Sequence, residues 1–169
     1  MQLIIIRHAI AEDKERFAKT GRPDTERPLT KHGRTVMAAV AKGLQRQARS
    51  IDVLAASPLV RAAQTASIVA REYGGMSVGT VPALAPQSAP SAFAAWLRTQ
   101  RNVNAVAVVG HEPHLGTLIT WLISGLRDSH VTLEKGGACM LEIEGQPRAR
   151  CATLTWLLPP DVLAKLARK

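Results

Sequence analysis

The first predicted strand and the two residues after it constrain this chain more than any other stretch. Residues 3–6 are four consecutive apolar residues, Leu-Ile-Ile-Ile, and such a run is typical of a short strand buried on both faces. Arg7 and His8 follow directly at its carboxyl end. In open α/β sheets ligands bind at that edge. A guanidinium offers a planar fork of donors for phosphate, and an imidazole can act as a nucleophile or carry a proton. The alternative is a solvated Arg-His loop, and the rest of the chain decides against it.

Strands and helices alternate along the next hundred residues. After a long polar loop over residues 12–28, Thr30 is a favourable N-cap for a helix over residues 31–48. Ser57 and Pro58 are the favoured N-cap and first residue of the next helix, which ends at the Gly-Gly pair 74–75. A third helix is predicted around residues 93–97 and a fourth over 113–123, while strands are predicted at 51–56, 76–81 and 103–109.

The last third of the chain predicts two further strands, at residues 138–144 and 150–158. A short turn joins them, which makes them an antiparallel hairpin, and a short basic helix follows the Pro-Pro pair 159–160. The alternation upstream favours parallel crossovers. We therefore expect one α/β domain over residues 1–169 with three layers, α/β/α, and a mostly parallel sheet closed by the C-terminal hairpin.

Composition excludes several classes of function. The net charge is +9, but the Lys and Arg residues are scattered among acidic ones, and the few aromatics are not interleaved with basic residues as in proteins that stack bases. We therefore expect a preference for anions, without nucleic-acid binding. No apolar run is long enough to span a membrane, and no signal peptide is evident, so we expect a cytoplasmic protein with no membrane partner. Cys139 and Cys151 are expected to be reduced packing thiols.

Residues suited to binding phosphate follow three of the predicted strands. Arg7 and His8 follow the first, Arg61 lies in the first turn of the helix after the second, and His111 follows the fourth. Taken singly, Arg7 could be a salt-bridge partner, Arg61 a surface residue and His111 a helix cap. In a parallel sheet these strand ends share one edge, so we expect the four side chains to meet in one crevice. The helices that begin there would add free N–H groups and partial positive charge.

Four stretches in this order resemble the histidine phosphatase superfamily, and most closely its SixA-type phosphohistidine phosphatases. They are residues 5–9 (IIRHA), 27–30 (RPLT), 56–66 (ASPLVRAAQTA) and 109–113 (VGHEP). The resemblance implies a phosphoglycerate mutase-like fold and a nucleophilic His8 that is phosphorylated during turnover. Arg7, Arg61 and His111 would bind the phosphate, with no cofactor and no metal. It also implies a phosphohistidine-bearing protein or a small phosphorylated molecule as substrate.

Two departures from the family pattern affect these expectations. The superfamily's usual Arg-His-Gly is Arg-His-Ala here, so Ala9 must accept the backbone geometry that glycine normally takes. Members that act on phosphate esters often carry an acidic residue in the loop after the third strand, and residues 82–91 contain none. The proton donor is left open among Glu12, Glu112 and solvent.

The chemistry of these residue types favours phosphoryl transfer without a metal. Arginine forks and an imidazolium can neutralise the equatorial oxygens while a neutral histidine attacks in line. Other mechanisms fit the spacing poorly: the second histidine of His111-Glu112-Pro113-His114 comes one residue too early for a zinc protease helix, and His32 and His114 are expected at the surface or as caps. Two alternatives stay open, a phosphatase for small phosphomonoesters and a non-catalytic basic module that only binds phosphate groups.

Overall fold

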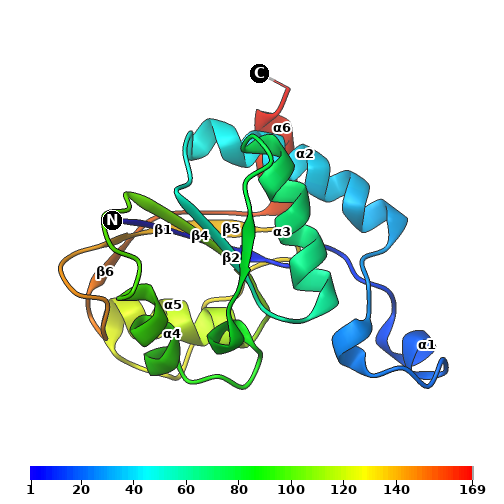
Figure 1. Ribbon diagram of the computed structural model, residues 1–169, viewed down its shortest axis with the longest axis horizontal. Helices are drawn as coiled ribbons and strands as arrows, with labels where there is room; N and C mark the ends of the chain where they lie inside the picture. The colour runs from blue at the N-terminus through cyan, green and yellow to red at the C-terminus, as the bar shows by residue number, and fades with distance from the viewer. Residues whose placement is uncertain (169) are drawn as a thin grey trace.

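The computed structural model describes residues 1–168 as one six-stranded sheet between two layers of helices (Figure 1). The strand order is β3-β2-β4-β1-β5-β6. The parallel strands are β1 (Gln2–Arg7), β2 (Val53–Ala56), β3 (Val78–Thr80) and β4 (Ala105–Gly110). The strands β5 (Ala138–Ile143) and β6 (Ala152–Leu158) form the antiparallel hairpin, with β5 paired to β1. The predicted three-layer fold is therefore confirmed; Lys169, the last residue of the expected domain, lies outside the described residues.

The first strand lies at the centre of the sheet, as its apolar run predicts. Residues Leu3 to Ile6 are all 0% exposed. Ile4 and Ile6 pack with α2 (Lys31–Gln47), α3 (Val60–Glu72) and α6 (Pro160–Leu166) on one face. Leu3 and Ile5 pack on the other face with α4 (Pro90–Leu97) and α5 (His114–Ser124). The side chains of a strand alternate between faces, so one apolar run supplies both cores.

The helix α2 begins at its predicted residue because its N-terminus carries a strong local signal, and it ends at Gln47, one residue before the predicted end. The Thr30 side chain accepts a hydrogen bond from the Gly33 N–H at 2.8 Å. Farther along, Gly43 allows close contact with α6, since a Cβ atom there would stand 1.7 Å from the Leu163 carbonyl oxygen. The C-terminal helix is thus fixed against α2 by backbone proximity.

Two expectations about the elements are wrong. The helix α3 begins at Val60 with Leu59 as its N-cap, and the Ser57 hydroxyl lies 2.8 Å from His111 instead of capping the helix. The polar segment expected as a loop contains α1 (Lys14–Ala18) and a 3₁₀ turn, η1 (Asp24–Glu26). The Asp13 carboxylate caps α1 by accepting from the Arg16 N–H, a signal that is visible in the sequence.

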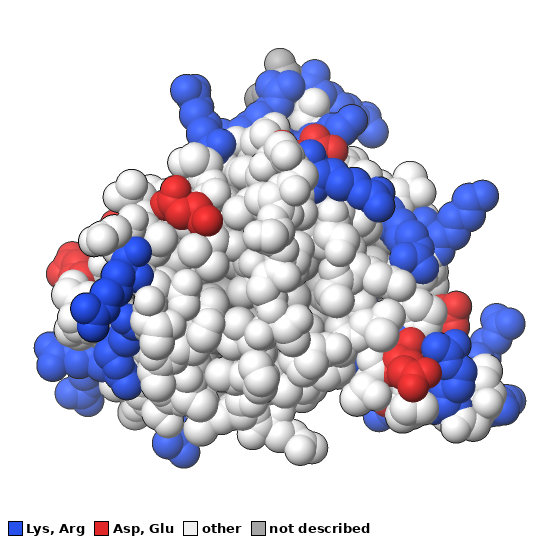
Figure 2. All heavy atoms as spheres, viewed as in Figure 1, with Lys and Arg blue, Asp and Glu red and all other residues white. Residues whose placement is uncertain are grey.

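The two cysteines are buried and unbridged, as the sequence predicts. Cys139 and Cys151 are free and buried, and burial raises the pKa of the Cys139 thiol to about 12. Basic side chains lie around the rim of the face in Figure 2, with acidic ones among them, and form no single patch there. Among the described helices, none has the length and apolarity needed to cross a lipid bilayer.

Candidate active site

The carboxyl ends of β1, β2 and β4 meet at one cavity of about 730 Å³, as the sequence predicts. Arg7, His8, Arg61 and His111 all line it. β1 lies between β4 and β5, so the carboxyl end of β1 adjoins the carboxyl end of β4. This pairing places the residues that follow the two strands next to each other. The imidazole rings of His8 and His111 are 5.1 Å apart between centroids. Four residues from three distant segments thus share one crevice.

The His8 ring is held in one orientation by the chain that follows it. Its Nδ1 atom lies 2.7 Å from the Ala9 carbonyl oxygen. A carbonyl oxygen can only accept, so Nδ1 carries the proton and the Nε2 lone pair stays free. Burial lowers the pKa of His8 to about 4, despite the Ala9 hydrogen bond, and the nearby Arg61 and Arg7 guanidinium groups act in the same direction as burial. His8 is therefore a neutral imidazole with an available nitrogen at neutral pH.

Ala9 fits where the superfamily usually has glycine. It is buried, it is not among the positive-φ residues, and its N–H donates to the Thr65 hydroxyl at 3.0 Å. Thr65 in turn donates to the Arg61 carbonyl oxygen at 2.7 Å. A methyl group therefore costs no backbone strain at this position. The first of these hydrogen bonds joins the loop after β1 to α3, and the second lies within α3.

His111 is 2% exposed and its Nε2 atom lies 2.8 Å from the Ser57 hydroxyl. Burial lowers its pKa to about 3, with further lowering by His8 and Arg61. The sequence argument favours the protonated form during reaction; in the unliganded site burial instead keeps this ring neutral. A phosphate dianion beside it would raise the pKa, because a negative charge stabilises imidazolium.

The two arginines of the site are partly engaged by the protein itself. Arg7 donates from Nη1 to the Leu133 carbonyl oxygen at 2.6 Å. Arg61 is not the surface residue that its sequence position alone would allow, since it is only 5% exposed. It donates to the Asp24 carbonyl oxygen at 2.9 Å and pairs with the Asp24 carboxylate at 3.2 Å. Asp24 also pairs with Arg27 at 2.7 Å.

Unused hydrogen-bonding atoms gather at this cavity. The buried side-chain nitrogens without a partner among the described residues include Arg7 Nε, Arg61 Nε and His111 Nδ1, all on residues that line it. Buried donors are almost always paired in folded proteins, so these unpaired groups mark a position suited to binding an acceptor. A tetrahedral anion in the crevice would bring acceptors and negative charge to three cationic or cation-forming side chains.

The acidic residues around the cavity differ in how they are engaged. Glu112 accepts from the Leu133 N–H at 2.8 Å and from the Gly116 N–H at 3.1 Å, so both of its oxygens hold the backbone. Asp24 is tied to Arg61 and Arg27. Burial alone would raise its pKa, but the hydrogen bond with Arg27 and the charges of both arginines outweigh burial and hold the pKa below the usual value. Glu12 also lines the cavity, and no hydrogen bond of its side chain is found within residues 1–168. The loop after β3 contributes Pro86 and Gln87 to the cavity, and neither is an acid.

Sequence reasoning missed several neighbours of the four residues. Asp24, Lys135 and Gln87 line the cavity and were not predicted. Arg27 lies within a stretch that matches the family, which was the available signal for it. His114, expected at the surface, is 4% exposed, and burial lowers its pKa. No group of three or more His, Cys, Asp or Glu side chains in the described part of the chain is placed to hold a metal ion.

Comparison with known proteins assigns the chain to a family. Residues 3–89 match the model of the histidine phosphatase superfamily, branch 1. The chain belongs to the histidine phosphatase superfamily. An uncharacterized protein of Picosynechococcus sp. is 36% identical over 170 residues, covering 94% of this chain and all of that protein.

Two solved structures of the superfamily show how closely the whole fold agrees. The protein histidine phosphatase SixA, complexed with tungstate, superposes with a TM-score of 0.81 at 26% identity, over 96% of this chain and 99% of that one. The alpha-ribazole phosphatase from Shigella flexneri superposes with a TM-score of 0.72 at 20% identity, over 95% and 97% of the two chains. This member of the superfamily is accordingly a phosphatase, with a phosphoglycerate mutase-like fold.

Proposed function

We propose that this phosphatase removes the phosphoryl group from phosphohistidine on a protein, with His8 as its nucleophile and no metal. The observation that carries the proposal is the hydrogen bond that His8 Nδ1 donates to the Ala9 carbonyl oxygen. This hydrogen bond leaves the neutral Nε2 atom free inside a cavity whose lining includes several cationic side chains. A neutral, oriented imidazole is suited to attack phosphorus. Arg7, Arg61 and His111 would bind the phosphoryl oxygens.

The reaction proceeds in two displacements at phosphorus. His8 Nε2 forms a bond to phosphorus as the bond from phosphorus to the substrate imidazole breaks. Solvent has already protonated the other nitrogen of the substrate ring, so the departing nitrogen keeps the electron pair and the ring leaves as neutral imidazole. Water then attacks the phosphohistidine at residue 8, giving inorganic phosphate and neutral His8 and releasing a proton to solvent. His111, made cationic by the bound phosphate, stabilises charge on the oxygens in both steps.

The substrate class follows from the weak supply of protons in the cavity. An alkoxide leaving group needs a positioned acid, an effect of about 10²–10⁴-fold. Glu112 and Asp24 are both committed to other partners, and the loop after β3 supplies Gln87 instead of an acid. Glu12, from the loop after β1, is the remaining candidate donor. An imidazole leaving group can be protonated by solvent beforehand, so a site without an acid in the loop after β3 loses little. This favours phosphohistidine over an alkyl phosphate.

The nucleophile is tested by trapping the intermediate. Wild-type protein mixed with substrate and quenched without acid should carry an acid-labile phosphoryl group on His8. The His8→Ala variant should lose turnover and stay folded, whereas His32→Ala, which changes an exposed histidine on α2, should behave as wild type. Near wild-type turnover by His8→Ala would refute the assignment. Phosphate binding without turnover in the wild type would instead support the non-catalytic binding module.

The substrate class is tested by comparing kcat/KM for a phosphohistidine carrier protein, an aryl phosphate and an alkyl phosphate. We expect values in that descending order, because the basicity of the leaving group rises along the series. An alkyl phosphate turned over as efficiently as the carrier would establish the small-phosphomonoester phosphatase in its place.

A further inference from the structure

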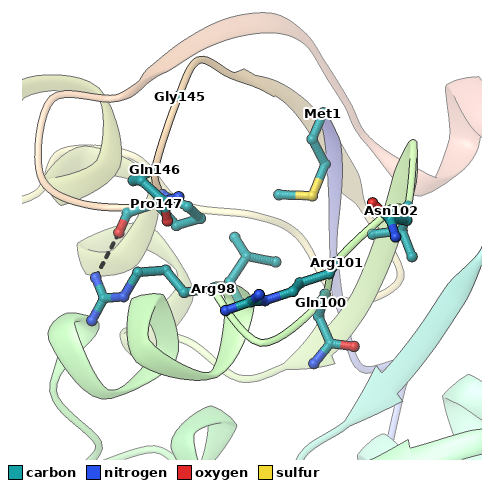
Figure 3. Close-up of a pocket in the computed structure, with 10 residues that line it drawn as sticks. Met1, Arg98, Gln100, Arg101, Asn102, Gly145, Gln146 and Pro147 are labelled. Carbon is teal, nitrogen blue, oxygen red and sulfur yellow. Dashed lines mark hydrogen bonds between the residues drawn. The ribbon is translucent and has the colours of Figure 1, made fainter.

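A second cavity of about 600 Å³ lies at the opposite edge of the sheet from the candidate site (Figure 3). One wall is formed by residues 97–103, between α4 and β4, and the other by the β5–β6 turn at residues 145–147. Met1, at the start of β1, completes it. A six-residue strand rises about 3.3 Å per residue, so the two cavities lie about 20 Å apart. A ligand bound here would therefore be distinct from one bound at His8.

The charges that line this cavity are positive and unpaired. Arg98 and Arg101 both line it, no acidic side chain does, and neither arginine forms an ion pair with another residue of the described chain. The nearby Glu142 is already engaged by the Met1 amino group at 3.3 Å. A concave site lined by charges of one sign concentrates the electrostatic field and attracts ions of the opposite charge.

The two guanidinium groups are arranged toward the same space. Arg98 donates from Nη1 to the Pro147 carbonyl oxygen at 2.8 Å, which holds its guanidinium against the turn. Figure 3 shows the Arg101 side chain extending from the segment between α4 and β4 in the direction of Arg98. Asn102 and Gln146 add two primary amides, whose side chains have no hydrogen-bond partner within residues 1–168. Guanidinium and amide groups together are the donors that recognise phosphate oxygens.

We propose that this cavity binds a small molecule that carries a diphosphate group. One guanidinium held against the turn at Pro147 and a second on the wall of residues 97–103 match two adjacent phosphates better than one. The volume lies within the range of about 300–1,000 Å³ typical of small-molecule sites and exceeds the needs of a single phosphate. The Met1 side chain and Pro147 provide apolar surface for an organic remainder.

The test follows backbone amide resonances during titration of the whole protein with inorganic diphosphate, ADP and inorganic phosphate. We expect the amide resonances of Asn102, Gly145 and Gln146 to shift on addition of diphosphate or ADP. The dissociation constants from these shifts should be at least fivefold lower than the constant for inorganic phosphate. Tighter ADP than diphosphate binding would show that the organic part contributes, and equal binding would assign the recognition to the diphosphate alone. Shifts confined to residues around His8 and His111 would overturn the proposal.

Matched variants separate a built site from general attraction by a basic protein. Arg98→Gln/Arg101→Gln should weaken diphosphate binding at this cavity at least tenfold and leave the shifts around His8 unchanged. Arg49→Gln/Arg127→Gln removes the same charge from exposed positions elsewhere and should change binding less than twofold. Arg101→Gln alone removes no hydrogen bond within the described chain and serves if the double variant unfolds. Equal losses in the paired variants, or none in either, would refute the site.

Discussion

Replacing Ser57 by alanine should weaken catalysis through His111, which Ser57 orients. Ser57 is 1% exposed, and its hydroxyl, 2.8 Å from Nε2, is the one hydrogen-bond partner of the His111 ring among the described residues. Losing a buried hydrogen bond and leaving the imidazole nitrogen unsatisfied costs about 1–3 kcal/mol. If the cost falls on the transition state, kcat/KM drops about 5- to 150-fold, since about 1.4 kcal/mol corresponds to a factor of ten.

The assay is steady-state hydrolysis of p-nitrophenyl phosphate across a range of pH, alongside thermal unfolding. In the complex, protonated His111 would donate to both phosphate and Ser57, so losing Ser57 should lower the pKa of His111. The alkaline decline of activity should then begin at lower pH in Ser57→Ala. Ser67→Ala is the matched control, because that exposed hydroxyl donates only to the Ala63 carbonyl within α3. A Ser57→Ala variant within twofold of wild type, with an unchanged pH profile, would refute the reasoning.

Three further predictions concern stability and metal dependence. Burial lowers the pKa of His8 to about 4 and of His111 to about 3, against 6.5 when unfolded, so the unfolded chain binds more protons below pH 6.5. The unfolding free energy should therefore fall between pH 6.5 and 4, by up to about 1.4 kcal/mol per pH unit for each histidine, and urea titrations with equal values at pH 7 and 5 would contradict this. Gly43→Ala should cost about 1–3 kcal/mol in the same titration, because its Cβ would overlap the Leu163 carbonyl. Activity should survive EDTA; inactivation reversed by a divalent ion would refute a metal-free mechanism.

Local patterns predicted the sheet and the meeting of its strand ends. The apolar run before Arg7 and the Thr30 cap are short-range signals, and the meeting of the strand ends needed only the rule that the carboxyl ends of parallel strands share an edge. This was enough to place Arg7, His8, Arg61 and His111 in one crevice.

The parts that sequence could not predict depend on contacts between distant segments. The ion pair between Asp24 and Arg61 joins α3 to η1. The polar segment that contains η1 has no apolar periodicity that would predict a helical turn. Ser57 has the signature of an N-cap, but its hydroxyl is engaged by His111, and the helix begins beyond it. His114 is buried by the packing of α5. A polar residue next to a proline gives no sequence signal for this burial.

The central place of β1 has a consequence for how the chain folds. β1 is hydrogen-bonded on one side to β4, and on the other to β5, so its neighbours end at Gly110 and Ile143. Closing such long loops costs conformational entropy before the strands form the hydrogen bonds that compensate for it. Pairing between strands far apart in the sequence therefore slows folding. During synthesis, β1 is made before the other strands of the sheet. More than a hundred further residues must be synthesised before β5, its second neighbour, is complete. We therefore expect the first-made part of the proposed active site to be among the last parts to become ordered.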